Sequence, residues 1–282
     1  MTAPMPGVPA GWEAMSAAER DAAYNNAAAV ADAAGYRARR TAASVLARGR
    51  PGAVLDAPYG PRERNRIDLF PAGDPAAPCL VFIFGGYWQM NSQDSFAAVA
   101  DGVRAHGWSA ALPGYTLAPE ATLRGIVGEI DAALDWLSRE GKAHGIAGRL
   151  VVSGWSAGGH LAAIALEHPA VTAGLALSGI FELAPLRETY LNEKLRLTAE
   201  EIAQLSPLRR PVSPKPLVVA YGEAELPALV QNSRDFHACR TAAGAPGALL
   251  PLAGHDHFSV LEDMQRADGA VTRALLALAA GD

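Results

Sequence analysis

The stretch from Arg149 to His160, RLVVSGWSAGGH, constrains the fold of this chain more than any other segment. It joins a β-branched run to a GxSxG sequence centred on Ser156, and an Ala- and Leu-rich pattern typical of a helix follows. A sharp turn from strand to helix needs small neighbours, which Gly154, Ala157 and Gly158 supply. The stretch therefore predicts a nucleophile elbow, with the Ser156 hydroxyl exposed at the N-terminus of a helix.

Strand-like segments alternate with helix-like segments through most of the chain. Besides the run before Ser156, the predicted strands span residues 66–70, 79–84, 109–112, 174–178, 216–221 and 248–252. The predicted helices between them span residues 94–107, 122–141 and 229–243. Such alternation predicts an α/β fold with a mostly parallel sheet, right-handed crossovers and helices on both faces.

Two segments outside this alternation are expected to cover the site. Residues 1–282 are expected to form a single domain, because 282 residues with 50% hydrophobic content can bury one large core. An N-terminal segment of about residues 1–50, rich in alanine, predicts one or two helices that cap the site. Residues 181–214 form an insertion after the sixth core strand, where we expect a lid.

Charge patterning gives no sign of a nucleic-acid partner. The net charge is -5, and no stretch interleaves Lys or Arg with aromatic residues. The pairs Arg39–Arg40 and Arg209–Arg210 are predicted to lie on solvated faces. No apolar run approaches the roughly 18 residues of a membrane span, and residues 1–11 lack the pattern of a secretion signal. We therefore expect a cytoplasmic protein without a membrane partner.

Neither metal nor other cofactor chemistry is predicted. The two cysteines, Cys79 and Cys239, form no disulfide framework and match no metal-ligand spacing. Both are predicted to be small buried apolar residues in a reducing compartment. His255 and His257 alternate in a loop around an aspartate, but the spacing offers no third ligand.

An activated serine needs a histidine base, and an acid must orient that base. In α/β-hydrolases these groups follow in the order serine, acid, histidine, and the base lies in a loop after the last strand. His255 and His257, in the sequence GHDHF, occupy such a loop. His160 and His168 follow Ser156 along the same predicted helix, so both are interpreted as structural.

The acid and the oxyanion donors are also restricted to two loops. The loop after strand 216–221 offers Glu223 and Glu225, either of which could accept the Nδ1–H of the base. A tetrahedral oxyanion needs two backbone N–H donors. One is predicted from Ala157, and the other from Gly86 or Tyr87 in the Gly-rich loop FGGYWQ.

Several motifs together resemble one branch of the α/β-hydrolases. The motifs GGYWQ, PGYTLAP, GWSAGGH and DHF look like those of the kynurenine formamidase (arylformamidase) group within the esterase/lipase superfamily. Three further stretches, SGIFEL, SPL and NSRDF, agree with this group. The resemblance therefore extends from about Tyr59 to the C-terminus. It implies an α/β-hydrolase fold, to which the Ala-rich N-terminal segment adds the predicted helical cap.

The resemblance also narrows the open choices at the site. It implies that Ser156 is the nucleophile, His257 the base and Glu225 the acid, with Glu223 as the runner-up. Where the family has a histidine before its two glycines, this chain has Phe84. Support for the oxyanion loop must therefore come from elsewhere.

The resemblance implies hydrolysis of an aryl formamide such as N-formylkynurenine to the arylamine and formate, a step of tryptophan catabolism that needs no cofactor. The partner is then a small-molecule substrate, and a homodimer is a further expectation. The residues expected to wall the substrate pocket are aromatic, namely Phe84, Tyr87, Trp88, Trp155 and Phe258. Two alternatives stay open, namely a carboxylesterase acting on small-acyl esters and a non-catalytic binding module that kept the fold.

Overall fold

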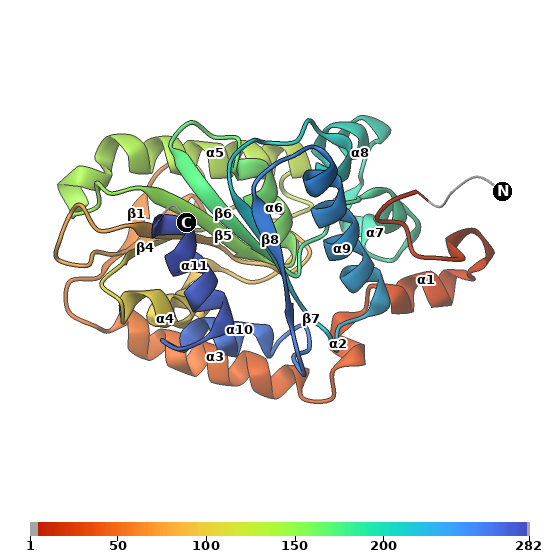
Figure 1. Ribbon diagram of the computed structural model, residues 1–282, viewed down its shortest axis with the longest axis horizontal. Helices are drawn as coiled ribbons and strands as arrows, with labels where there is room; N and C mark the ends of the chain where they lie inside the picture. Colours follow the sequence, from red (N-terminus) through yellow and green to blue (C-terminus); the bar gives the residue numbers. More distant parts are fainter. Residues whose placement is uncertain (1–4, 281–282) are drawn as a thin grey trace.

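A mostly parallel sheet of eight strands runs through the molecule (Figure 1). The structure is a computed structural model that describes residues 5–280, so the ends of the predicted 1–282 domain and the first four residues of the predicted cap lie outside the described residues. The strand order is β1-β2-β4-β3-β5-β6-β7-β8. The strands are β1 Val54–Pro58, β2 Arg66–Phe70, β3 Cys79–Ile83, β4 Ser109–Pro113, β5 Leu150–Trp155, β6 Val171–Leu177, β7 Leu217–Gly222 and β8 Gly247–Leu252.

The parallel part of the sheet confirms the predicted βαβ alternation. The pairs β1–β2 and β2–β4 are antiparallel, and every pair from β4–β3 to β7–β8 is parallel. All residues of the central strands β3 and β5 are buried, as expected for strands that helices cover on both faces. Because parallel strands end at one edge, the loops after β3, β5, β6, β7 and β8 gather there.

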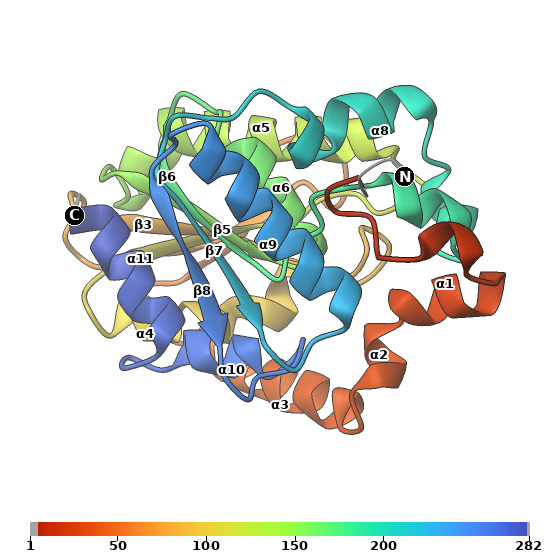
Figure 2. The same ribbon diagram turned by 45° about the vertical axis from the view of Figure 1, so that its right-hand side comes forward.

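Helices cover both faces of the sheet (Figures 1 and 2). On one face lie α5, α6 and α9, and on the other lie α4, α10 and α11 together with a 3₁₀ helix, η2. These helices are η2 Gln93–Ala100, α4 Asp101–Arg104, α5 Leu123–Glu140, α6 Ala157–Ala165, α9 Pro227–Ala242, α10 Val260–Gln265 and α11 Ala270–Ala280. No helix in the described part of the chain is both long and apolar enough to cross a membrane.

Helix α5 illustrates how local sequence sets these elements. Its buried side chains recur at helical spacing and form one apolar stripe, comprising Leu123, Ile126, Ile130, Ala133, Leu134 and Leu137. The Thr122 hydroxyl caps its first turn by accepting the Gly125 N–H at 3.1 Å. The prediction of a helix over residues 122–141 is confirmed to within a residue at each end.

The segment predicted to be helical, residues 94–107, is helical from Gln93 to Arg104 but is not a regular α-helix throughout. The segment begins as the 3₁₀ helix η2 and becomes α-helical only over α4. Its backbone is held by neighbouring segments, since the Ala98 N–H donates to the Ser44 hydroxyl at 3.2 Å. A side chain at Gly102 would put a Cβ atom 2.4 Å from the Met264 carbonyl oxygen. The strand β1 and the helices α10 and α11 were not predicted.

The N-terminal segment and the insertion after β6 meet beside the carboxyl edge of the sheet (Figure 2). The N-terminal helices are η1 Trp12–Ala14, α1 Ala17–Ala23, α2 Asn26–Ala29 and α3 Ala33–Arg48, and the insertion contains η4 Ala184–Glu188, α7 Asn192–Leu195, α8 Ala199–Leu205 and η5 Pro207–Arg209. An ion pair joins Arg20 to Glu188, and the Tyr190 N–H donates to Asp21 at 2.8 Å. Helix α3 packs against η2. The predicted N-terminal cap is therefore present.

Three single-residue predictions require correction. Arg40 is not on a solvated face, because its guanidinium carbon lies 3.9 Å from the centre of the Phe96 ring and the residue is 5% exposed. Arg210 is half-buried and forms an ion pair with Glu167 at 2.6 Å, whereas Arg209 is exposed as predicted. Cys239 is half-buried rather than buried, whereas Cys79 is buried as predicted.

Candidate active site

The strand-to-helix turn after β5 has the geometry of a nucleophile elbow. Ser156 has φ 58° and ψ -120°, a backbone conformation that L-residues rarely adopt. The turn requires a close approach between segments, because a Cβ atom on Gly158 would lie 2.0 Å from the Ile83 carbonyl oxygen. This explains why the residue two after the serine has no side chain.

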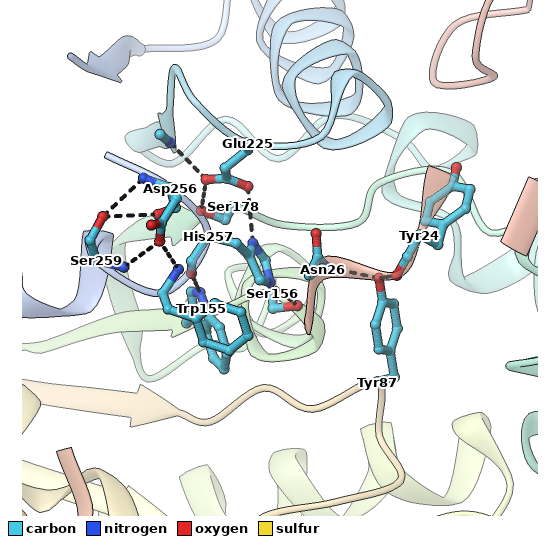
Figure 3. Close-up of polar contacts among 12 residues, drawn as sticks. Tyr24, Asn26, Tyr87, Trp155, Ser156, Ser178, Glu225, Asp256, His257 and Ser259 are labelled. Atoms are coloured by element: carbon cyan, nitrogen blue, oxygen red, sulfur yellow. Dashed lines mark hydrogen bonds and ion pairs between the residues drawn. The ribbon is translucent and has the colours of Figure 1, made fainter. Parts of the chain in front are cut away.

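Ser156, His257 and Glu225 form a continuous chain of hydrogen bonds (Figure 3). The His257 Nε2 atom lies 3.1 Å from the Ser156 Oγ atom. The His257 Nδ1 atom lies 3.0 Å from Glu225 Oε2. The three side chains come from different parts of the chain, namely the turn after β5, the loop after β7 and the loop after β8. They meet because those loops leave the same edge of the sheet.

The Glu225 carboxylate is buried and receives three hydrogen bonds. Its side chain has 0% exposure. Besides His257, it accepts the Ser178 hydroxyl at 2.5 Å and the Gly222 N–H at 2.7 Å, both at Oε1. A buried carboxylate group needs such hydrogen-bond donors to offset the loss of its contacts with water. Ser178 and Gly222 therefore fix the carboxylate so that its second oxygen faces the imidazole.

Hydrogen bonds between the backbone and the side chains of Asp256 and Trp155 hold the loop that carries His257 in place. Asp256 accepts the N–H groups of Phe258 and Ser259, each at 2.8 Å. The Trp155 indole N–H donates to the His257 carbonyl oxygen at 2.7 Å, and the two rings are 4.8 Å apart. The sequence did not indicate these roles for Trp155 and Asp256.

The other two candidates for the base and the acid lie apart from this chain of hydrogen bonds. His255 is half-buried and makes no side-chain hydrogen bond within the described chain, and its carbonyl oxygen accepts the Ala224 N–H at 3.0 Å. Glu223 is exposed. Within residues 5–280, no group of three or more His, Cys, Asp and Glu side chains is arranged to hold a metal ion.

The loop after β3 brings the predicted oxyanion donors to the elbow. Gly86 has φ 125° and Tyr87 has φ 51°, so the backbone turns sharply at these two residues. Neither their amides nor that of Ala157 donates to another group in the described part of the chain. None of these three N–H groups is therefore engaged in a hydrogen bond within residues 5–280.

Side chains from elsewhere support this loop, as the absence of a histidine at Phe84 requires. The Tyr115 hydroxyl donates to the Phe84 carbonyl oxygen at 2.9 Å, and the Asn91 amide donates to the Gly85 carbonyl oxygen at 2.8 Å. The Tyr87 hydroxyl donates to the Tyr24 carbonyl oxygen. These three hydrogen bonds hold the oxyanion loop in place.

The N-terminal cap takes part in this support (Figure 3). The Asn26 amide donates to the Tyr87 hydroxyl at 2.9 Å, while that hydroxyl donates to Tyr24. Burial raises the pKa of Tyr87 well above its usual value, so the phenol stays neutral and keeps both bonds. The cap and the oxyanion loop are therefore linked through one tyrosine.

A small pocket of about 110 Å³ opens onto Ser156 and His257. Trp155 and Phe258 line it, as expected for substrate-binding residues. Phe84 and Trp88 do not line it. Phe84 stacks on Tyr115 with ring centres 4.2 Å apart.

Trp88 lies in the core rather than in the pocket wall. It is fully buried, and its ring meets that of His160 edge-on, with ring centres 5.0 Å apart. Its neighbour Tyr87 is the residue of this loop that reaches the pocket, because the sharp turn directs successive side chains to different sides. The expectation that Phe84 and Trp88 wall the pocket does not match this placement.

Part of the pocket wall comes from the cap and the insertion, the two segments expected to cover the site, although none of their individual residues was predicted to line it. Asn26, Arg37 and Arg40 contribute from the cap, and Tyr190 contributes from the insertion. One sequence signal could have indicated that cap residues line the pocket: Arg37 and Arg40 lie one helical turn apart and so share a face of the helix.

His160 is buried on α6, and its Nε2 atom lies 2.8 Å from the Leu205 carbonyl oxygen, in agreement with a structural role. Burial lowers its pKa from 6.5 to about 4. The folded protein therefore holds this imidazole neutral, while the unfolded chain binds a proton at a higher pH. The stability that this neutral imidazole contributes is complete above about pH 6.5 and is lost as the pH falls toward 4.

We expect the free energy of unfolding to fall by on the order of 3 kcal/mol through this titration. Urea denaturation at a series of pH values measures it. A His160→Gln variant should show a shallower loss between pH 6.5 and 4, and the exposed His106→Gln variant controls for removing a histidine. Parallel curves for wild type and His160→Gln would contradict the assignment.

Comparison with known proteins places this chain among hydrolases. The family model BD-FAE matches residues 67–172. A kynurenine formamidase from Danio rerio is 28% identical over 239 residues, which cover 79% of this chain and 80% of that protein. The similarity therefore covers most of both chains and agrees with the resemblance inferred from the motifs.

Solved structures share the fold. A protein from Silicibacter sp. tm1040, named as a candidate thioesterase, superposes with a TM-score of 0.82 at 29% identity and covers 92% of this chain and 99% of its own. An esterase from Pyrobaculum calidifontis superposes with a TM-score of 0.71 at 17% identity and covers 88% and 92%. The chain thus has the α/β-hydrolase fold, as predicted, and is a hydrolase by its relatives.

Proposed function

We propose that this α/β-hydrolase, which is similar over most of its length to kynurenine formamidases, hydrolyses an aryl formamide such as N-formylkynurenine to the arylamine and formate. The observation that carries the proposal is the unbroken hydrogen-bond chain Ser156–His257–Glu225 at the wall of a small pocket. A nucleophile, a base and an orienting acid in this arrangement support acyl transfer to the serine.

In the first half of the reaction, Ser156 Oγ attacks the formyl carbon. His257 Nε2, 3.1 Å away, takes the hydroxyl proton, and Glu225 stabilises the resulting imidazolium through Nδ1. The carbonyl oxygen becomes an oxyanion that accepts hydrogen bonds from the amides of Ala157 and of Gly86 or Tyr87. Collapse breaks the C–N bond while His257 returns its proton to the leaving amine.

In the second half, water replaces the amine. His257 takes a proton from water, the hydroxide attacks the formyl ester on Ser156, and collapse releases formate and regenerates the serine hydroxyl. Each half uses the same base and the same oxyanion donors. No group beyond the described side chains and backbone amides is required.

The size of the pocket favours a small acyl group. Its volume of about 110 Å³ is below the roughly 300–1,000 Å³ of typical ligand pockets, and formyl is the smallest acyl group. The aromatic side chains of Trp155 and Phe258 provide surfaces for an aryl ring. An aryl amine also leaves more easily than an alkyl amine, because the ring delocalises its lone pair.

A carboxylesterase acting on small-acyl esters is the second candidate function. The observation in its favour is the structural similarity to esterases, together with Phe84 in place of the histidine of the formamidases. The same three side chains would serve both reactions, so the distinction lies in the leaving group.

The decisive experiment is kcat/KM of the purified protein for N-formylkynurenine beside p-nitrophenyl acetate, with Ser156→Ala as the blank. Formamide hydrolysis that depends on Ser156 and reaches about 10⁴ M⁻¹s⁻¹ or more supports the proposal. Ester cleavage without formamide cleavage supports the carboxylesterase. Absence of both activities would indicate the non-catalytic binding module.

The identity of the acid gives a separate prediction. Glu225→Ala is expected to lower kcat by about 10³- to 10⁴-fold, because the imidazole loses the partner that fixes its tautomer. Glu223→Ala is the matched control, two residues away in the same loop and exposed, and should change kcat less than about twofold. Steady-state kinetics on the preferred substrate decides, and a larger loss at Glu223 would reverse the assignment.

A cytoplasmic location and a homodimer remain predictions from the sequence. Cell fractionation tests the first, and light scattering during size-exclusion chromatography tests the second.

A further inference from the structure

Positively charged side chains line the pocket at Ser156, and no acidic side chain within residues 5–280 does. Two guanidinium groups, those of Arg37 and Arg40, are part of its wall. No aspartate or glutamate of the described chain lines the same pocket. The pocket therefore presents positive charge without a neighbouring protein anion.

Arg40 carries a buried cation without a counter-ion. Its guanidinium carbon lies 3.9 Å from the Phe96 ring centre and 6.0 Å from that of Trp155. Its Nε atom donates to the Ser95 carbonyl oxygen at 3.0 Å. Arg40 forms no ion pair with a carboxylate of residues 5–280. Burial lowers the pKa of Arg40 to about 10, and nearby Arg37 adds to this shift. Placing a charge here is costly unless an anion offsets it.

Arg37 lies one helical turn before Arg40 on α3. Its guanidinium carbon is 5.9 Å from the centre of the Phe258 ring, directly after His257 in the chain. Arg39, on the same helix, is neutralised by Asp32 at 2.9 Å and by Glu262 at 3.2 Å. By contrast, Arg37 forms no ion pair within the described residues. Arg39, which lies outside the pocket, is therefore neutralised by carboxylates. Arg37 and Arg40, which line the pocket, have no ion-pair partner within the described residues.

We propose that Arg37 and Arg40 form a subsite for a carboxylate on the substrate, so that the pocket selects aryl formamides whose side chain carries a carboxylate group. The inference rests on the proposed function, in which Ser156 is the nucleophile of this pocket. Guanidinium groups bind carboxylates through paired, charge-assisted hydrogen bonds, which fix orientation as well as add affinity. An anion between the two arginines would offset their mutual repulsion and hold the aryl ring between the cap and Phe258.

The test compares substrates that differ only in this charge. The first pair is N-formylkynurenine and its α-carboxamide; both carry the same α-ammonium group, so the words anionic and neutral refer here to the carboxylate and the carboxamide alone. The second pair, para-acetoxybenzoate and para-acetoxybenzamide, asks the same question of ester hydrolysis. Arg37→Gln should raise KM for the anionic member of the pair that the enzyme turns over by about tenfold, and change KM for the neutral member less than twofold. The preference of wild type for the anionic member should weaken at higher salt.

Two further variants keep the test decisive. Arg40→Lys retains the charge in the core but loses the planar fork, and should also reduce the preference for the anionic substrate. Arg39→Gln is the matched control on the same helix and should leave the preference unchanged. Equal KM changes for the charged and neutral substrates, or no change in either, would overturn the carboxylate subsite.

The two substrate pairs separate this proposal from the proposed function. If only esters are cleaved, the formamidase proposal fails, while the ester pair still reports on the arginines. If formamides are cleaved without regard to charge, the function holds and the subsite fails.

Discussion

Replacing Ser156 by alanine is expected to lower kcat on any substrate of this protein by at least about 10⁴-fold. The hydroxyl is the only group of the hydrogen-bond chain that can form the covalent intermediate, and its removal leaves the base with nothing to activate except water. The fold should be unaffected, because the alanine removes one oxygen from a turn whose backbone is fixed by close packing around Gly158. Steady-state kinetics and circular dichroism of the same preparation measure both effects.

A second serine provides the matched control. Ser153 lies on the same strand, β5, is fully buried, and its hydroxyl has no hydrogen-bond partner in the described chain. Ser153→Ala should therefore leave kcat within about twofold of wild type. If Ser156→Ala retained more than about one per cent of wild-type kcat, after exclusion of contaminating hydrolases, the assignment of Ser156 as nucleophile would fail.

The features that the sequence predicted well are local ones. The strand, turn and helix around Ser156 follow from β-branched residues, small residues and an Ala-rich pattern within about fifteen positions. The parallel sheet follows from the repetition of such units. The order serine, acid, histidine then restricted the base and the acid to two loops.

Packing between distant segments decided the rest. Phe84 precedes the glycine pair and Trp88 follows it by two residues, yet both side chains enter the core, and the direction of Trp88 depends on the positive φ values of Tyr87 and Trp88. Arg40 was assigned to solvent because its neighbour in sequence is charged. Its burial depends on the packing of α3 against η2, which no local sequence pattern predicts.

The choice within each loop was also beyond local reasoning. Glu223 and Glu225 differ by two positions, and only the course of the loop places one carboxylate beneath Ser178 and the Gly222 amide. His255 and His257 differ in the same way. There the family resemblance supplied the answer that spacing alone left open.

His257→Ala is expected to lower kcat by about 10⁴- to 10⁶-fold, comparable to the loss at Ser156. Without the imidazole the serine hydroxyl is not activated, and without the serine the imidazole has no nucleophile of the protein to activate. Combining the two substitutions should cost little more than either one, since groups that act as a unit have non-additive effects. Measurement of kcat for the single and double variants tests this coupling directly.

His255→Ala is the control that makes this result specific. It removes an imidazole of the same loop, which contacts neither Ser156 nor Glu225 through a side-chain hydrogen bond. We expect it to retain at least about half of wild-type kcat. Equal losses at the two histidines would mean that the loop acts as a whole and that His257 is not the sole base. A large loss at His255 alone would transfer the role to that residue, and the Ser156–His257 distance of 3.1 Å would then describe a resting contact rather than the path of the proton.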